Sequence, residues 1–296
     1  IVIRRTEALI IDLKDDGVSG MDSFLSQLTS LKSSAQNVTD ETSRRDTYKK
    51  VRQLQREVSF KNPLLNVDTL LFNRFFIEES SSHMVLQYIK CRSMTPARIC
   101  YLVNPFSDEP QVVDVLENSV AQNGTFKGEK LGDCMIQPDL SFDGKKIAFS
   151  HEHNIFSVNT DGSDLRQLTD GKNENDWDPC WLPGDERLVF VSLRRGGSGR
   201  CHTKPTFCMY GCSSEGGDVI PISYHETNEW HPSINNNGKI VFCRWDYVDR
   251  DSDIAHHIWI CGPDGTDPRA PHGNYPHPYT KLDVDLPWYN SPKAGR

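Results

Sequence analysis

The chain contains 296 residues, of which 36% are hydrophobic and 25% are charged, and its formal net charge is -8. This composition is typical of a soluble globular protein, and a propeller or barrel of this length can form one domain. The acidic balance argues against nucleic-acid binding, which requires a basic surface, and the sequence has no apolar run of about 18 residues that could span a membrane.

Residues 1–62 are predicted to form a helical N-terminal segment. Apolar residues recur at helical spacing in 21–31 and again in 46–58. Either Asp40 or Ser43 is placed to cap the second of these helices. Because the stretch between them is polar, the segment is expected to be a helical hairpin.

The spacing of apolar residues changes at Leu70. Segments 70–76 and 99–103 are predicted to be β-strands, and 111–116 another short strand or a turn of helix. Terminal repeats are often atypical, so we assign 68–130 to a first, divergent copy of the repeat that follows.

One stretch of sequence occurs three times. At 138–150 a polar turn that closes on Asp-Gly precedes an alternating apolar run, the pattern of a hairpin turn entering a half-buried strand. Related stretches occupy 179–190 and 232–242, and their leading prolines are 41 and 53 residues apart. A period near the first value is typical of propeller blades.

A second turn follows each copy, and a short apolar strand precedes that turn. These second turns are 159–164, 213–218 and 262–267. Turn, strand, loop, strand, turn and strand make up most of a four-stranded blade. The predicted regular blades are 131–171, 172–224 and 225–273.

The sequence therefore predicts an all-β propeller over 63–277, preceded by the helical segment and followed by an irregular tail at 278–296. About four blades are present, and four blades without a closing strand would leave a sheet edge unpaired, which proteins avoid. We expect the chain to be part of a propeller with six to eight blades, unless the tail is a divergent closure. The chain does not begin with methionine, so a lost signal peptide stays open.

The nine cysteines do not define a disulfide framework. Cys100, Cys243 and Cys261 lie in strand-like runs, where a cysteine usually behaves as a small buried hydrophobe. Cys208 and Cys212 are expected to be a disulfide or two buried thiols rather than a zinc knuckle. The CxxCH motif of covalent haem attachment occurs nowhere in the chain.

The first candidate site is the loop 194–202, which lengthens the second repeat. Its glycines permit close backbone approach, and Arg194, Arg195 and Arg200 stand among them. An anion or cofactor contact is one interpretation. A metal ion bound by Cys201 and His202 is a second, and a solvated connection between strands is the third.

The second candidate site is the segment 225–231. It differs from the HExxH zinc motif, because position 229 is glutamate and the context is a loop entering a strand. The segment matches Asn175–Asp178 one blade earlier, so its tryptophan is expected to be a plug between blades. His225, Glu229 and His231 are predicted to point into the central channel, where propellers usually bind ligands.

The third candidate site is an acidic loop after Arg244. Its carboxylates could hold a calcium ion through oxygen ligands, or they could form salt bridges with Arg244 and Arg250 on the surface. Both interpretations stay open. The candidate ligands are Asp246, Asp249, Asp251 and Asp253.

These turns and loops resemble a known family. The Asp-Gly turns look like TolB-type propeller repeats, and the loops resemble the large propeller proteins related to the α subunit of hydrazine synthase, from about residue 55 to 277. The segments that carry this resemblance are 62–65, 176–183, 194–202, 225–232, 244–253, 256–257 and 272–276.

The resemblance implies a longer oxidoreductase parent with c-type haem in other segments, an extracytoplasmic location, and a protein partner or a linked haem domain. In the family a zinc ion lies near the active haem, so Cys201 and His202 are the candidates for a metal contact carried over. Because this chain has no CxxCH motif, haem is expected only through the parent protein or a partner.

We expect a propeller domain that scaffolds a partner, a cofactor domain or a metal, and that is not catalytic by itself, since the repeat is strong and no catalytic constellation is complete. One alternative is that the domain forms a wall of a haem- or metal-dependent redox site. A further alternative is a periplasmic TolB-like module that binds protein or glycan ligands.

Overall fold

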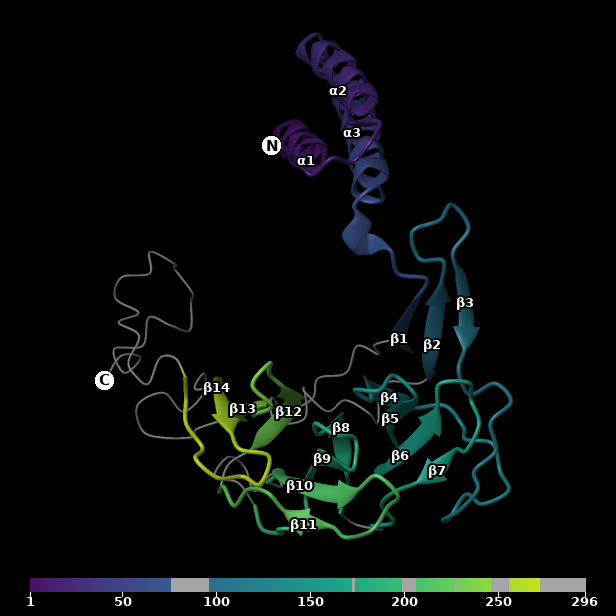
Figure 1. The fold of residues 1–296 in the computed structure, drawn as a ribbon, viewed down its shortest axis with the longest axis vertical. Coiled ribbons are helices and arrows are strands. Elements are labelled where there is room, and N and C mark those ends of the chain that lie inside the picture. The colour runs from purple at the N-terminus through teal and green to yellow at the C-terminus, as the bar shows by residue number, and fades with distance from the viewer. Residues whose placement is uncertain (76–95, 172–173, 199–205, 227, 246–255, 272–296) are drawn as a thin grey trace. The chain divides into compact units, whose positions relative to one another are not determined.

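The computed structural model describes residues 1–75, 96–171, 174–198, 206–226, 228–245 and 256–271 (Figure 1). The chain divides into two compact units. One contains Ile1–Leu70 with Leu102–Val112, and the other contains Leu71–Tyr101 with Val113–Arg296. The second unit holds the repeat and the candidate site residues.

The first unit contains α1 (Val2–Asp15), α2 (Met21–Gln36), α3 (Glu41–Ser59) and a short 3-10 helix, η1 (Pro63–Leu65). The Asp40 side chain caps α3 by accepting the Ser43 backbone N–H at 2.9 Å, as one of the two predicted caps. Helix α1 was not predicted, although it places Thr6, Ile10 and Leu13 on one buried stripe. The expected hairpin is therefore a three-helix unit with one core. That core contains Ile10, Leu13, Met21, Leu28, Val51, Leu54 and Val58.

The β-strands form four antiparallel sheets, each with its strands in chain order (Figure 1). We call them blades 1 to 4. Blade 1 contains β1 (Thr69–Phe75), β2 (Ala97–Val103) and β3 (Gln111–Asp114). Blade 2 contains β4 (Met135–Leu140), β5 (Lys146–His151), β6 (Asn154–Asn159) and β7 (Arg166–Gln167). Blade 3 contains β8 (Trp177–Trp181), β9 (Arg187–Ser192), β10 (Cys208–Ser213) and β11 (Ile220–Pro221), and blade 4 contains β12 (Glu229–Ile234), β13 (Ile240–Trp245) and β14 (His256–Cys261).

This topology confirms the predicted fold class, a segment of a β-propeller preceded by helices. Blade 4 has the start of a fourth strand, because Ile260 and Arg269 form a β-bridge. The first strands of blades 2, 3 and 4 (β4, β8 and β12) pack against one another in sequence order, as innermost propeller strands do.

Alternation along the second strand of each blade explains why both faces of the blades are apolar. In β5, Phe149 packs toward blade 1 in a cluster with Ile99, and Ala148 packs toward blade 3 with Phe190. In β9, Val189 packs in turn toward blade 4 with Phe242. Each interior blade is thus buried on both sides.

The two kinds of turn that reveal the repeat lie at one end of each blade. In an up-and-down sheet, the turns after the first and third strands share one end, and the connection after the second strand lies at the other. In blade 2 the turns after the first and third strands are 141–145 and 160–163, and they lie at the same end. We call the opposite end of the blades the loop end. It carries the connections after β5, β9 and β13, and those that lead into β8 and β12.

Candidate functional site

The predicted site residues that the structure describes lie at the loop end of blades 3 and 4. The structure describes five of them, namely Arg194, Arg195, His225, Glu229 and His231. The remaining candidates lie outside the described residues. These are Arg200, Cys201, His202, Asp246, Asp249, Asp251 and Asp253.

Glu229, the first residue of β12, lies in a buried ion pair. Its side chain has no exposed surface, and Arg244 donates to Oε1 from Nε at 3.0 Å and from Nη2 at 2.7 Å. Ser223 donates its hydroxyl to Oε2, and the Arg244 guanidinium lies 4.1 Å from the ring centre of Trp259. Burial raises the pKa of Glu229, while the charge of Arg244 opposes that shift. Glu229 therefore holds blade 4 together, and its predicted contact with a cofactor stays a prediction.

Blade 3 contains a second buried pair at the matching position. Asp176 has a fully buried side chain, and it accepts hydrogen bonds from Arg194 Nη1 and, at 2.6 Å, from the Ser192 hydroxyl. Burial raises the pKa of Asp176, and Arg194 opposes the shift. Asp176 was not a predicted site residue, although Asn175-Asp176-Trp177 matches Asn228-Glu229-Trp230. Arg194 thus has a structural partner at the base of its loop.

The first strands share an unusual backbone feature. Gln137, Asp178 and His231 each precede a proline, and their φ values are 57, 57 and 53°. The strand register shifts at each of these positions. Positive φ is uncommon for non-glycine residues, so its recurrence in three blades indicates that the surrounding structure imposes it.

These three residues form a chain of hydrogen bonds that we call the inner-strand ladder. The Asp178 N–H donates to Gln137 Oε1 at 3.1 Å, and the His231 N–H donates to Asp178 Oδ2 at 2.6 Å. In each case the side chain of one blade accepts the backbone N–H of the next. Gln137 and Asp178 were not predicted as site residues, and the repeated proline was the signal for them.

His231 combines partial exposure with a carboxylate partner. Its Nδ1 lies 2.8 Å from Asp178 Oδ2, and 45% of its side-chain surface is exposed. The hydrogen bond with Asp178 raises the pKa of His231, while burial opposes the increase. A carboxylate that orients an imidazole is the arrangement found in proton transfer and behind metal-bound histidines. Of the described candidates, His231 is the one best suited to exchange a proton near neutral pH.

We predict that the Asp178–His231 contact contributes more to stability at acidic pH than at alkaline pH. The pKa of His231 in the folded state is raised above its value in the unfolded chain, which is about 6.5. The contribution is therefore complete below about pH 6.5 and is lost as the pH rises through the folded-state pKa. An NMR titration of the His231 ring measures this directly. Asp178→Asn should lower the His231 pKa, and an unchanged titration curve would contradict the prediction.

The other described candidates contribute less. Arg195 is exposed, and His225 is half-buried with its carbonyl accepting the Cys208 thiol at 3.2 Å. Cys208 and Cys212 are two buried thiols rather than a disulfide. Burial raises their pKa values to about 11 and about 12, so neither is a thiolate at neutral pH.

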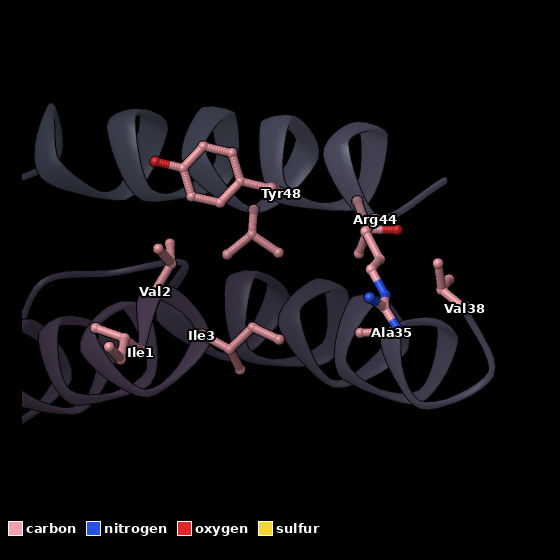
Figure 2. A pocket seen from close by; sticks show the side chains of 9 residues that line it. Ile1, Val2, Ile3, Ala35, Val38, Arg44 and Tyr48 are labelled. Carbon is pink, nitrogen blue, oxygen red and sulfur yellow. The ribbon is translucent and has the colours of Figure 1, made fainter. Parts of the chain in front are cut away.

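A pocket of about 310 Å³ lies within the helical unit (Figure 2). Aliphatic side chains at the start of α1 face Tyr48 of α3, and Arg44 lies beside Ala35. Arg44 has the one charged side chain among its lining residues, and no carboxylate, histidine or cysteine lines it. The pocket therefore lacks the groups needed for acid–base chemistry or metal binding.

In the part of the chain that the structure describes, no group of three or more His, Cys, Asp and Glu side chains is placed to hold a metal ion. The candidate zinc and calcium ligands fall outside that part, so those sites stay predictions. Among the described helices, none is long and apolar enough to cross a membrane.

No protein-family model and no curated protein matches the sequence, but solved structures share the fold. Hydrazine synthase from Kuenenia stuttgartiensis matches with a TM-score of 0.53 and 19% identity, over 71% of this chain and 32% of that chain. A putative TolB from Agrobacterium tumefaciens matches with a TM-score of 0.42 and 18% identity, over 59% of this chain and 56% of that chain. TolB from Acinetobacter baumannii matches with a TM-score of 0.43 and 12% identity, over 79% of this chain and 48% of that chain. The match to hydrazine synthase shows a shared fold, and the chain spans 32% of the hydrazine synthase chain that it matches.

Proposed function

We propose that this chain is a scaffolding propeller module of a larger protein or complex, and that its loop end binds a protein partner or a cofactor-carrying domain. One observation carries the proposal. Blade 2 joins its second and third strands through Glu152 and His153 alone, whereas blades 3 and 4 use the longer connections 193–207 and 246–255 at the same end. Long loops on a rigid scaffold are where proteins most often place their binding residues.

The buried ion pairs support this proposal, because each one stands where an insertion begins. Arg194 enters the connection of blade 3 and is held by Asp176. Arg244 lies at the end of β13 and is held by Glu229. A buried charged pair that is held by several hydrogen bonds fixes its surroundings, and each of these pairs holds the arginine from which its insertion leaves. Rigid supports of this kind are what a binding surface needs.

We further propose an extracytoplasmic location and a hydrazine synthase α-subunit-like parent, with the fold similarity as the support. In this proposal the insertion of blade 3 would contact an anion or cofactor through Arg194, Arg195 and Arg200. Zinc would be bound by Cys201 and His202. The acidic loop of blade 4 would bind calcium, and haem would come from the parent protein or a partner.

The proposed function is tested by shortening one insertion. Replacing 195–205 with a two-residue turn like that of blade 2 should preserve the propeller and abolish partner binding. The measurement is affinity capture from cells of the source organism after chemical crosslinking, with the natural and shortened chains as baits. A stoichiometric protein captured by the natural chain alone supports the proposal. Identical captures with both baits would contradict it.

The alternative, in which this domain forms one wall of a metal-dependent redox site, makes a different prediction. The purified natural chain would then contain about one equivalent of zinc or iron, and both Cys201→Ala and His202→Ala would lose it. Elemental analysis by mass spectrometry measures this, with Cys212→Ala, a buried thiol, as the matched control. Metal that is retained in all three variants would exclude Cys201 and His202 as ligands.

A further inference from the structure

The pocket of the helical unit lies between three helices and has an aliphatic wall (Figure 2). Val2 and Ile3 of α1 and Ala35 of α2 are half-buried beside it, and Val51 of α3, which is 2% exposed, also lines it. Its volume of about 310 Å³ is at the lower end of the range of about 300–1,000 Å³ in which proteins bind small molecules. The wall therefore fits the aliphatic part of a small ligand.

One end of this pocket carries a positive charge. Arg44 has the one charged side chain among the lining residues. In Figure 2 this side chain extends from α3 toward Ala35 of α2, beside Val38. Binding pockets combine an apolar wall with a few polar groups that orient the ligand. An aliphatic wall with a single cation at one end therefore fits a ligand that has an apolar body and one anionic group.

The acidic groups near Arg44 in the sequence have other partners. Asp40 accepts the backbone N–H of Ser43 at 2.9 Å, and Glu41 pairs with Arg45 at 3.4 Å. Among the residues that the structure describes, none forms an ion pair with Arg44. Arg44 also lies among the first four residues of α3, where the helix dipole disfavours a cation and favours an anion. An anion supplied by a ligand would therefore stabilise this end of the helix.

We propose that the pocket binds a small aliphatic monocarboxylate, with its chain along Val2 and Ile3 and its carboxylate on the Arg44 guanidinium. A guanidinium matches a carboxylate through two parallel N–H···O hydrogen bonds. The small volume favours a chain of about eight carbons. The pocket lies in the helical unit and the loop end in the other unit, so this binding does not depend on the proposed function.

The single charge of Arg44 favours this ligand over other occupants. A neutral hydrocarbon would fill the space but leave Arg44 without a counter-ion, and a cationic amphiphile would be repelled by it. A phosphate monoester carries close to two charges at neutral pH, whereas the lining residues supply one cationic side chain. A monocarboxylate is the ligand whose charge the pocket balances.

The test is an NMR titration of the intact chain with octanoate, which follows the methyl groups of the helical unit. Octanoate should cause saturable shifts at Ala35 and Val51, which line the pocket. Val58 is fully buried in the same unit but does not line the pocket, so its methyl groups should not shift. The alcohol 1-octanol has the same chain without the charge, and should bind at least about tenfold more weakly.

Substitutions separate recognition of the charge from recognition of the chain. Arg44→Met should weaken octanoate binding at least about tenfold and leave 1-octanol binding unchanged, because only the charged contact is removed. The matched control is Arg45→Met, which removes the adjacent arginine and its exposed ion pair with Glu41. It should leave octanoate binding unchanged. Ala35→Phe should fill the pocket and abolish binding of both compounds, and circular dichroism checks that each variant keeps its helices.

Four results would overturn the proposal. The natural chain could show no saturable shift with octanoate. Equal affinities for octanoate and 1-octanol that Arg44→Met does not change would show that the pocket recognises no anion. Octanoate binding that survives Ala35→Phe would place the ligand elsewhere. Shifts at Ala35 that depend on protein concentration without any ligand would assign the pocket to a second copy of the chain.

Discussion

Replacing Arg244 with methionine is expected to lower the free energy of unfolding of the propeller by about 3–5 kcal/mol. Methionine keeps much of the apolar volume but leaves the Glu229 carboxylate fully buried without its cation. Because burial already raises the pKa of Glu229, the variant should protonate this group more readily. The stability lost should therefore be larger at pH 8 than at pH 5.

Urea unfolding monitored by tryptophan fluorescence measures this effect in the propeller unit, because all six tryptophans lie beyond residue 176. Lys146→Met removes a half-buried partner of the exposed Glu215, whose carboxylate lies 3.2 Å from Lys146 Nζ, and should cost at most about 1 kcal/mol. The double variant Glu229→Gln with Arg244→Met should be more stable than Arg244→Met alone. A double variant that is no more stable would show that the buried charge is not the cause.

Replacing Trp181 with alanine is expected to cost about 3–5 kcal/mol. Trp181 is fully buried between blades 2 and 3. Its backbone N–H donates to Asp139 Oδ2 at 2.7 Å, and its indole Nε1–H donates to the Asp139 carbonyl at 3.2 Å. The alanine variant would lose the largest side chain in the contact between these blades and leave a cavity.

The same unfolding experiment separates packing from hydrogen bonding. Trp181→Phe keeps an aromatic ring but loses the indole donor, and should cost about 1–3 kcal/mol. Phe142→Ala removes an aromatic side chain that is 60% exposed, and should change stability by less than about 0.5 kcal/mol. If Trp181→Ala were as mild as Phe142→Ala, blades 2 and 3 would not depend on this contact.

The propeller could be predicted from the sequence because its turns are local signals. An Asp-Gly turn needs a residue with φ > 0, and Gly144 has φ of 71°, so residues a few positions apart identify each hairpin. Helix α1 was missed although its own residues Thr6, Ile10 and Leu13 recur at helical spacing, and these residues complete the core that α2 and α3 form. A short amphipathic segment gains most of its stability from such tertiary packing.

The candidate site could be predicted only in part. Sequence reasoning selected Arg194, Glu229 and His231 as candidates, because arginine, glutamate and histidine near loops are residue types that often bind ligands. It could not find their partners, since Arg194 and Asp176 lie 18 residues apart and His231 and Asp178 lie 53 apart. Contacts between blades are long-range, and no local pattern specifies which acid meets which base.

The inner-strand ladder has a consequence for how this repeat can diverge. Its donor is always a backbone N–H, whereas its acceptor is a side chain that is Gln137 in one blade and Asp178 in the next. A duplicated blade therefore needs only the proline-bearing backbone to dock onto its predecessor, and its own side chain remains open to selection. The contact also has a direction, so duplicated blades can be added in only one order. In each such residue the backbone N–H docks the blade onto the one before it, while the side chain is free to take on another chemical role.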